Sequence, residues 1–201
     1  MAKVKICGLK RYEDIDMANE LRPDYVGFVF AKGSKRAVDY FYAQELKSVL
    51  DERISAVGVF VNNDIGEIVH LLNKKVIDIA QLHGDETEGD IIHIKKITKK
   101  PVIKAVSVKT IDDILKYKDS NADFLLFDNG RGGTGETFNW SALDRLKDFK
   151  KPFFFAGGLN ASNIKKAIEY QPFAVDVSGG VEIDGFKDFD KVKEFIDLVR
   201  R

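Results

Sequence analysis

Two residues that could exchange protons with a substrate stand at the ends of short apolar runs in this chain. Cys7 lies at the end of the first run, 4–8, and Asp128 closes the sixth, 124–128. A thiolate is a candidate general base, and a nearby cation or helix N-terminus would lower the pKa of the thiol that forms it. Burial favours the neutral form of a carboxyl group, which makes Asp128 a candidate general acid. As alternatives, Cys7 is a small buried hydrophobic residue, and Asp128 caps the glycine-rich loop 129–135.

Two glycine pairs follow the last two apolar runs. Gly157 and Gly158 end the seventh run, and Gly179 and Gly180 follow Ser178 at the end of the eighth. Adjacent glycines let backbone N–H groups approach an anion, and a helix N-terminus adds favourable dipole charge. We expect the first pair to run directly into a helix and the second to begin a short extra helix. The pairs predict a phosphate site, with ordinary tight turns as the alternative.

Further polar residues lie at or after other runs. Arg36 has a planar guanidinium group suited to binding a carboxylate or a phosphate. An ordinary surface arginine is an equally good interpretation of this residue. Strand alternation places Gln81 with His83, and Asp176 with Ser178, on common faces. His83 lacks the acidic or histidine neighbours of a metal site, and one cysteine can form neither an internal disulfide nor a thiolate zinc cluster. We therefore expect no metal.

The elements that must position these residues form a repeat. Eight apolar, β-rich runs occupy 4–8, 25–30, 56–62, 77–84, 102–108, 124–128, 153–158 and 174–180. They are nearly continuous in apolar residues, which is typical of parallel strands buried on both faces. Because eight strand–helix units are the number that closes a (β/α)8 barrel, we predict that fold over an open doubly wound sheet, as one catalytic domain over 1–201. In such a barrel the ligands bind at the C-terminal ends of the strands.

The segments between the runs have the helical period. The repeating apolar positions are Ile65, Ile68, Val69 and Leu72, and near the C-terminus Phe189, Val192, Phe195, Ile196 and Val199. Thr110 with Asp113 forms a candidate capping box. Asn160 or Ser162 is a candidate cap for the helix that contains Ile164. His70 and His93 fall within predicted helices.

Composition limits the classes of function. The chain of 201 residues has 32 Lys+Arg and 32 Asp+Glu, so it lacks the excess of positive charge that marks a nucleic-acid-binding surface. Its apolar runs are far shorter than the roughly 20 residues of a membrane span. The N-terminal residues read as a strand and not as a signal peptide. We expect a cytoplasmic enzyme that contacts neither nucleic acid nor membrane.

In these residues the chain resembles the phosphoribosylanthranilate isomerase family. The stretches that carry the resemblance are 4–8, 26–30 with 34–36, 58–62, 81–84, Asp128 with 132–135, 156–159 and 175–178. They occur in order along the whole chain. The resemblance implies a (β/α)8 barrel without a cofactor, acting on a small phosphorylated aminosugar.

The resemblance also implies roles for single residues. Cys7 matches the family's general base and Asp128 its general acid, and Arg36 matches the group that binds the anthranilate carboxylate. The loops at 157–158 and 178–179 match the phosphate clamp, and Asp176 matches a supporting polar residue. Gln81 and His83 complete the expected substrate-binding set. The implied reaction is the Amadori rearrangement of N-(5-phosphoribosyl)anthranilate in tryptophan biosynthesis.

The chain also departs from the family pattern, and other functions remain open. Many members have other residues at four positions, which here carry Asn139, Ala161, Gly179 and Asp184. Gly179 removes a hydroxyl group from the phosphate loop but keeps the backbone donor. The related isomerase of histidine biosynthesis, which has an aspartate where Cys7 stands, is the second candidate. A non-catalytic phosphosugar-binding barrel is the third, and the sequence leaves open whether the protein is a monomer or a homodimer.

Overall fold

Eight parallel strands close into a barrel in the computed structural model, which describes residues 1–128, 140 and 149–201. The strands are β1 (Lys3–Cys7), β2 (Tyr25–Val29), β3 (Ser55–Phe60), β4 (Ile79–Leu82), β5 (Val102–Ser107), β6 (Phe124–Asp128), β7 (Phe153–Phe155) and β8 (Ala174–Val177). Each strand pairs with the next in the chain, and β1 pairs with β8. The predicted (β/α)8 barrel is confirmed, and the alternative of an open doubly wound sheet is wrong.

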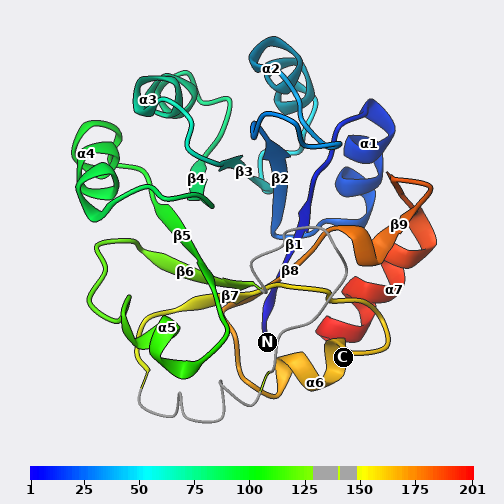
Figure 1. Ribbon diagram of the computed structural model, residues 1–201. Coiled ribbons are helices and arrows are strands. Elements are labelled where there is room, and N and C mark those ends of the chain that lie inside the picture. Colours follow the sequence, from blue (N-terminus) through cyan, green and yellow to red (C-terminus); the bar gives the residue numbers. More distant parts are fainter. Residues whose placement is uncertain (129–139, 141–148) are drawn as a thin grey trace.

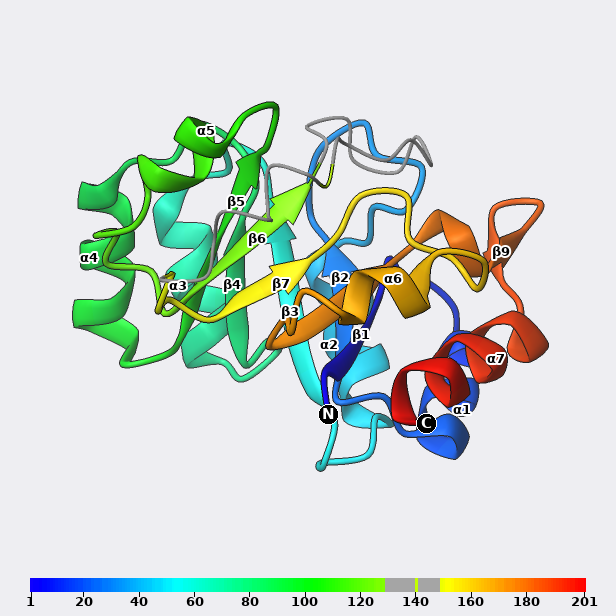
Figure 2. The same cartoon turned by 90° about the horizontal axis from the view of Figure 1, so that it is seen from below.

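Helices surround the strands (Figure 1). Those in the described part of the chain are α1 (Tyr12–Leu21), α2 (Tyr40–Ser48), α3 (Ile65–Asn73), α4 (Glu88–Thr98), α5 (Ile111–Leu115), α6 (Ile164–Ile168) and α7 (Phe189–Arg200). The last helix packs against both α1 and α6. Both chain termini lie at the end of the barrel opposite the arrowheads of the strands (Figure 2). No helix among the described residues is both long and apolar enough to span a membrane.

Alternation along the strands divides the core into two layers. The barrel interior is filled by Tyr25, Val57, Ile79, Ile103, Ala105, Leu126, Phe154, Ala156 and Ala174. The opposite face of the same strands packs against the helices, for example through Val26, Phe28, Leu125 and Phe127. Both faces are therefore buried in apolar contacts, which explains why the runs are apolar throughout.

The expected helix faces and one of the expected caps are confirmed. Ile68 and Leu72 of α3, and Val192, Phe195, Ile196 and Val199 of α7, are buried, whereas Phe189, the first residue of α7, is exposed. The backbone N–H of Thr110 donates to the Asp113 carboxylate over 2.8 Å, which is the expected capping box at the start of α5.

The predicted cap of α6 is wrong. The helix begins at Ile164 with Asn163 in the capping position, so neither Asn160 nor Ser162 is its cap. The Asn160 side chain instead accepts from the backbone N–H of Ser162, two residues on. Asparagine side chains readily form such local turns, and here the turn delays the start of the helix.

The two glycine turns differ from one another. Gly157 and Gly158 both have positive φ, of 87° and 67°, and α6 begins only at Ile164. The expectation that this pair runs directly into a helix is therefore wrong, because left-handed residues start a loop and not a helix. The expected short extra helix after β8 is confirmed as the 3-10 turn Gly179–Val181, and it leads into a hairpin of β9 (Glu182–Ile183) and β10 (Phe186–Lys187).

Candidate active site

Cys7 and Asp128 end strands β1 and β6, and all eight strands point the same way, so both residues lie on one rim of the barrel. Cys7 is partly exposed, whereas Asp128 is only 6% exposed. Gly27 of β2 stands beside Cys7 in register, and a Cβ there would lie 2.7 Å from the thiol sulfur. The missing side chain on β2 therefore makes room for the thiol at the rim.

A fully buried lysine lies directly below the thiol. Lys5 precedes Cys7 by two residues on β1, so both side chains project from the same face of the strand. Lys5 is 0% exposed, and its Nζ donates to both carboxylate oxygens of Asp176 on β8 over 3.0 Å. Pairing with Asp176 is what makes a charged group tolerable inside the barrel. Asp176, expected in the site, is thus the partner of a buried cation.

The charge around Cys7 does not produce the low pKa expected from the sequence. Burial raises the pKa of the Cys7 thiol, and the ammonium groups of Lys5 and Lys187 only partly oppose this effect. No helix begins at Cys7, because α1 starts at Tyr12. The nearby cations therefore do not lower the pKa of the thiol below its ordinary value, because loss of solvation outweighs them.

We expect Lys5→Met to slow the alkylation of Cys7 by iodoacetamide at pH 8. The substitution removes a cation that lowers the pKa of the thiol, and the thiolate fraction falls about tenfold for each unit of increase in that pKa. Because Cys7 is the only cysteine, mass spectrometry of the whole protein measures this one reaction. In the wild type, the rate should still rise with pH beyond about 8.5, the ordinary pKa of cysteine.

The control is the double variant Lys5→Met with Asp176→Asn. The single variant leaves the buried Asp176 carboxylate without its partner, at a cost of about 3–5 kcal/mol in stability, whereas the double variant removes both charges. Labelling as fast as in the wild type in both variants would show that Lys5 does not influence the thiol.

A second chain of contacts leads to the candidate acid. The amide nitrogen of Gln81 lies 3.1 Å from Nδ1 of His83, and Nε2 of His83 lies 3.4 Å from Oδ2 of Asp128. Gln81 is buried and His83 is partly exposed, so the imidazole is held between a fixed amide and the carboxyl group. The common face predicted for Gln81 and His83 is confirmed. Their arrangement orients His83 toward Asp128.

Arg36 is held by an acidic residue from the far end of the chain. Its Nε and Nη2 donate to the two carboxylate oxygens of Glu182 over 2.8 and 2.7 Å. Lys187 donates to the same carboxylate over 2.5 Å. Burial opposes ionisation of Glu182, but the hydrogen bonds and charges of Arg36 and Lys187 outweigh it and lower the pKa of Glu182 to about 2. Arg36 is therefore part of an ion-pair network and not an ordinary surface arginine.

Ser178 joins this network to the first strand. Its hydroxyl donates to the carbonyl oxygen of Cys7 over 2.9 Å, and Lys187 donates to the carbonyl and hydroxyl oxygens of Ser178 over 3.1 and 3.3 Å. Lys187 is buried, so its charge acts within the rim. The segment after β8 thus connects Cys7 with the Arg36–Glu182 pair.

The two glycine loops after β7 and β8 touch one another. A Cβ on Gly180 would collide with the carbonyl oxygen of Leu159, which only a glycine avoids. Within the described residues, the backbone N–H groups of Gly157 and Gly158 donate to no protein atom. The 3-10 turn that starts at Gly179 likewise leaves its first N–H groups without intrahelical partners. Donors from neighbouring strand ends are thus available to one anion.

Parts of the predicted site lie outside the described residues. These are the loop 129–135 and Asn139, whereas the adjacent Trp140 is buried against Phe155, with ring centroids 5.0 Å apart. Among the described residues, no group of three or more His, Cys, Asp or Glu is placed to hold a metal ion.

Sequence reasoning missed three charged residues of the rim. They are Lys5, Glu182 and Lys187. Lys5 carries a signal that could have been used, because it shares a strand face with Cys7 and falls inside an apolar run. Glu182 and Lys187 lie in a charged segment with no motif, and only the hairpin brings them together.

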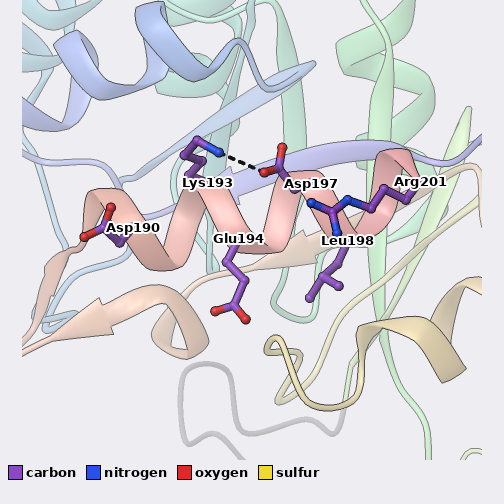
Figure 3. A pocket seen from close by; sticks show the side chains of 6 residues that line it. All are labelled: Asp190, Lys193, Glu194, Asp197, Leu198 and Arg201. Carbon is purple, nitrogen blue, oxygen red and sulfur yellow. Dashed lines mark hydrogen bonds and ion pairs between the residues drawn. The ribbon is translucent and has the colours of Figure 1, made fainter.

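A surface depression of about 320 Å³ lies elsewhere, on the outer side of α7. It is lined by Asp190, Lys193, Glu194, Asp197, Leu198 and Arg201 (Figure 3). Lys193 and Asp197 pair across one helical turn over 2.9 Å. The lining is a solvated helix face, and it contributes no group to the rim.

Comparison with known proteins identifies the family of the chain. The model of the N-(5'-phosphoribosyl)anthranilate (PRA) isomerase family matches residues 4–198. The chain belongs to this family. The N-(5'-phosphoribosyl)anthranilate isomerase of Clostridium acetobutylicum is 49% identical over 207 residues, covering 100% of this chain and 99% of the relative. The corresponding protein of Endomicrobium trichonymphae is 48% identical over 205 residues, with 100% and 99% covered.

Solved structures of PRA isomerases have the same fold. The crystal structure of the Thermotoga maritima enzyme superposes with a TM-score of 0.91 at 36% identity, covering 100% of this chain and 99% of that one. The resemblance seen in the sequence is thus confirmed, as is membership of an isomerase family.

Proposed function

We propose that this PRA isomerase family member converts N-(5-phosphoribosyl)anthranilate to 1-(2-carboxyphenylamino)-1-deoxyribulose 5-phosphate, a step of tryptophan biosynthesis, by general acid–base catalysis. The observation that carries the proposal is the rim itself, where a thiol on β1 and a carboxyl group on β6 stand at strand ends that also carry an arginine fork and two glycine loops. We further propose that 1–201 acts as one catalytic domain in the cytoplasm, as a monomer or a homodimer.

The chemistry needs two groups with opposite tasks. Protonated Asp128 donates its proton to the furanose ring oxygen, the C1′–O bond breaks, and the anilino nitrogen forms a Schiff base with C1′. Cys7 as thiolate then takes the proton from C2′, and the electron pair moves to give an enolamine that tautomerises to the ketone. Because burial favours the neutral thiol, kcat/KM should rise with pH as Cys7 ionises.

The remaining groups hold the two ends of the substrate. The loops at 157–158 and 178–179 bind the phosphate through backbone N–H groups, and Arg36 binds the anthranilate carboxylate. Fixing both ends positions the ribose between acid and base, which is a large part of what an active site contributes. Asp176 acts through Lys5, and Gln81 acts through His83.

The direct test is a turnover assay with the anthranilate substrate, followed by the loss of its fluorescence. Turnover supports the proposal. Activity only on the two-phosphate substrate of histidine biosynthesis would favour the second candidate. Binding of phosphosugars without turnover would favour the non-catalytic barrel.

We expect a phosphorylated product analogue to place its phosphate between the 157–158 and 178–179 loops. The two loops touch one another, their glycine N–H groups donate to no protein atom in the described part of the chain, and Gly179 keeps its backbone donor although it lacks a hydroxyl group. A crystal structure with the analogue measures this. Phosphate density at the opposite end of the barrel would contradict the assignment.

Arg36→Ala should weaken binding of the anthranilate end by roughly one to two orders of magnitude. A lost charge-assisted contact costs about 1.5–3 kcal/mol. Calorimetry with product analogues that carry or lack the carboxylate measures the effect. An equal loss for both analogues would show that Arg36 does not bind the carboxylate.

A further inference from the structure

Glu182 is the acidic centre of a three-residue cluster at the rim. The hairpin of β9 and β10 pairs Glu182 with Lys187 in register, and Arg36 reaches the same carboxylate from the loop after β2. The Glu182 side chain is only 8% exposed, and its pKa of about 2 keeps it ionised throughout the neutral range. The cluster is therefore a permanent, largely desolvated arrangement of charge.

The contacts use one edge of the Arg36 guanidinium and leave another free. Nε and one hydrogen of Nη2 donate to Glu182. A guanidinium has five N–H donors, so both hydrogens of Nη1 and the second hydrogen of Nη2 remain. In the described part of the chain, Nη1 donates to no protein group. The free edge is a second fork, with the spacing that suits a carboxylate.

The position of Arg36 is fixed from two sides. A Cβ on Gly8 would collide with Cδ of Arg36, so the arginine stem lies directly on the backbone that follows Cys7. Lys187, which holds Glu182, also holds Ser178, and Ser178 donates to the carbonyl oxygen of Cys7. The pair is thus tied to the same strand end as the candidate base.

We propose that Glu182 is a positioning residue for substrate binding: it clamps the Nε edge of Arg36 so that the opposite edge faces the anthranilate carboxylate. This inference rests on the proposed function. It assigns to Glu182 a role in affinity for one end of the substrate, without contact to the reacting atoms. Arg36 and Glu182 alone would be a neutral pair, and Lys187 on the same carboxylate leaves the cluster with a net positive charge for an incoming carboxylate.

If Glu182 instead hindered binding of the substrate carboxylate, its substitution would have the opposite effect on affinity. If Glu182 occupied the place of the substrate carboxylate, it would compete for Arg36, and neutralising it would tighten binding. If it orients Arg36, neutralising it replaces one acceptor oxygen by an N–H₂ group that repels the guanidinium donors, and binding weakens.

The experiment compares Glu182→Gln with the wild type, using the reduced product analogue with its carboxyphenyl group and the same molecule with a plain phenyl group. We expect the variant to lose roughly tenfold in affinity for the carboxylate analogue and to change less than about twofold for the phenyl analogue. In turnover, KM should rise by a similar factor while kcat changes little. Glu194→Gln, an exposed substitution of the same kind on α7, is the matched control and should leave both constants unchanged.

Glu182→Asp separates charge from size. It keeps the negative charge with a shorter side chain, so its affinity for the carboxylate analogue should lie between those of the wild type and Glu182→Gln. A residue that only fills space would be harmed more by the shorter aspartate than by the isosteric glutamine. Binding of the phenyl analogue shows that each variant is folded.

Three results would overturn the inference. They are an equal loss for both analogues, tighter binding of the carboxylate analogue by Glu182→Gln, and a larger loss for Glu182→Asp than for Glu182→Gln. If the wild type turns over the substrate and the variants show one of these results, only the role of Glu182 is disproved. A wild type with neither turnover nor a preference for the carboxylate analogue disproves the proposed function as well.

Discussion

Asp128→Asn should lower turnover by about 10²–10⁴-fold while the barrel stays folded. Asparagine has nearly the same size as aspartate and can occupy the same buried place at the end of β6, but its amide has no proton to give to the furanose oxygen. His83 keeps a polar atom beside its Nε2, so the Gln81–His83 contact should survive. The measurement is kcat with the anthranilate substrate, together with circular dichroism of the variant.

The matched control is Asp119→Asn, which makes the same change at a side chain that is 88% exposed. It should have wild-type kinetics. If Asp128→Asn also retained wild-type turnover with a native spectrum, proton donation would have to come from another group.

The second large effect is expected for Cys7→Ser, which should lose about 10²–10⁴-fold in kcat because a hydroxyl group, which hardly ionises near neutral pH, is a far poorer base than a thiolate. The substitution removes little volume, and Arg36 and the glycine loops are untouched. Binding of the product analogue should therefore persist. The dependence of kcat/KM on pH should also lose the rise that ionisation of the thiol produces.

Alkylation of the wild type provides the independent test. A neutral reagent should inactivate the enzyme with one label per chain, since Cys7 is the only cysteine, and the bound product analogue should slow the labelling. A packed, inert cysteine would instead label slowly, without protection by the analogue, and its serine variant would be active. That pattern would remove Cys7 from the mechanism.

The barrel could be predicted from the sequence because its signals are local. Each strand is a short apolar run, each helix has an apolar stripe, and eight such units are the number that closes the sheet. The rim residues Cys7 and Asp128 could be predicted for the same reason, since position at the end of a run determines position at the end of a strand. The start of α6 could not be predicted, because the turn at Asn160 and a helix beginning there differ in free energy by only a few tenths of a kcal/mol to about 1 kcal/mol.

The sequence by itself thus determined the fold, the family and the place of Cys7 and Asp128 at strand ends on the rim. Only the tertiary structure decided what those residues meet. Arg36 and Glu182 are 146 positions apart, and Lys5 and Asp176 are 171 positions apart, so no local pattern relates them. The protonation state that Cys7 favours likewise depends on residues that are distant in the sequence. It is the balance between lost solvation and the charges of Lys5 and Lys187, and that balance exists only when the closed barrel brings β8 and its hairpin against β1.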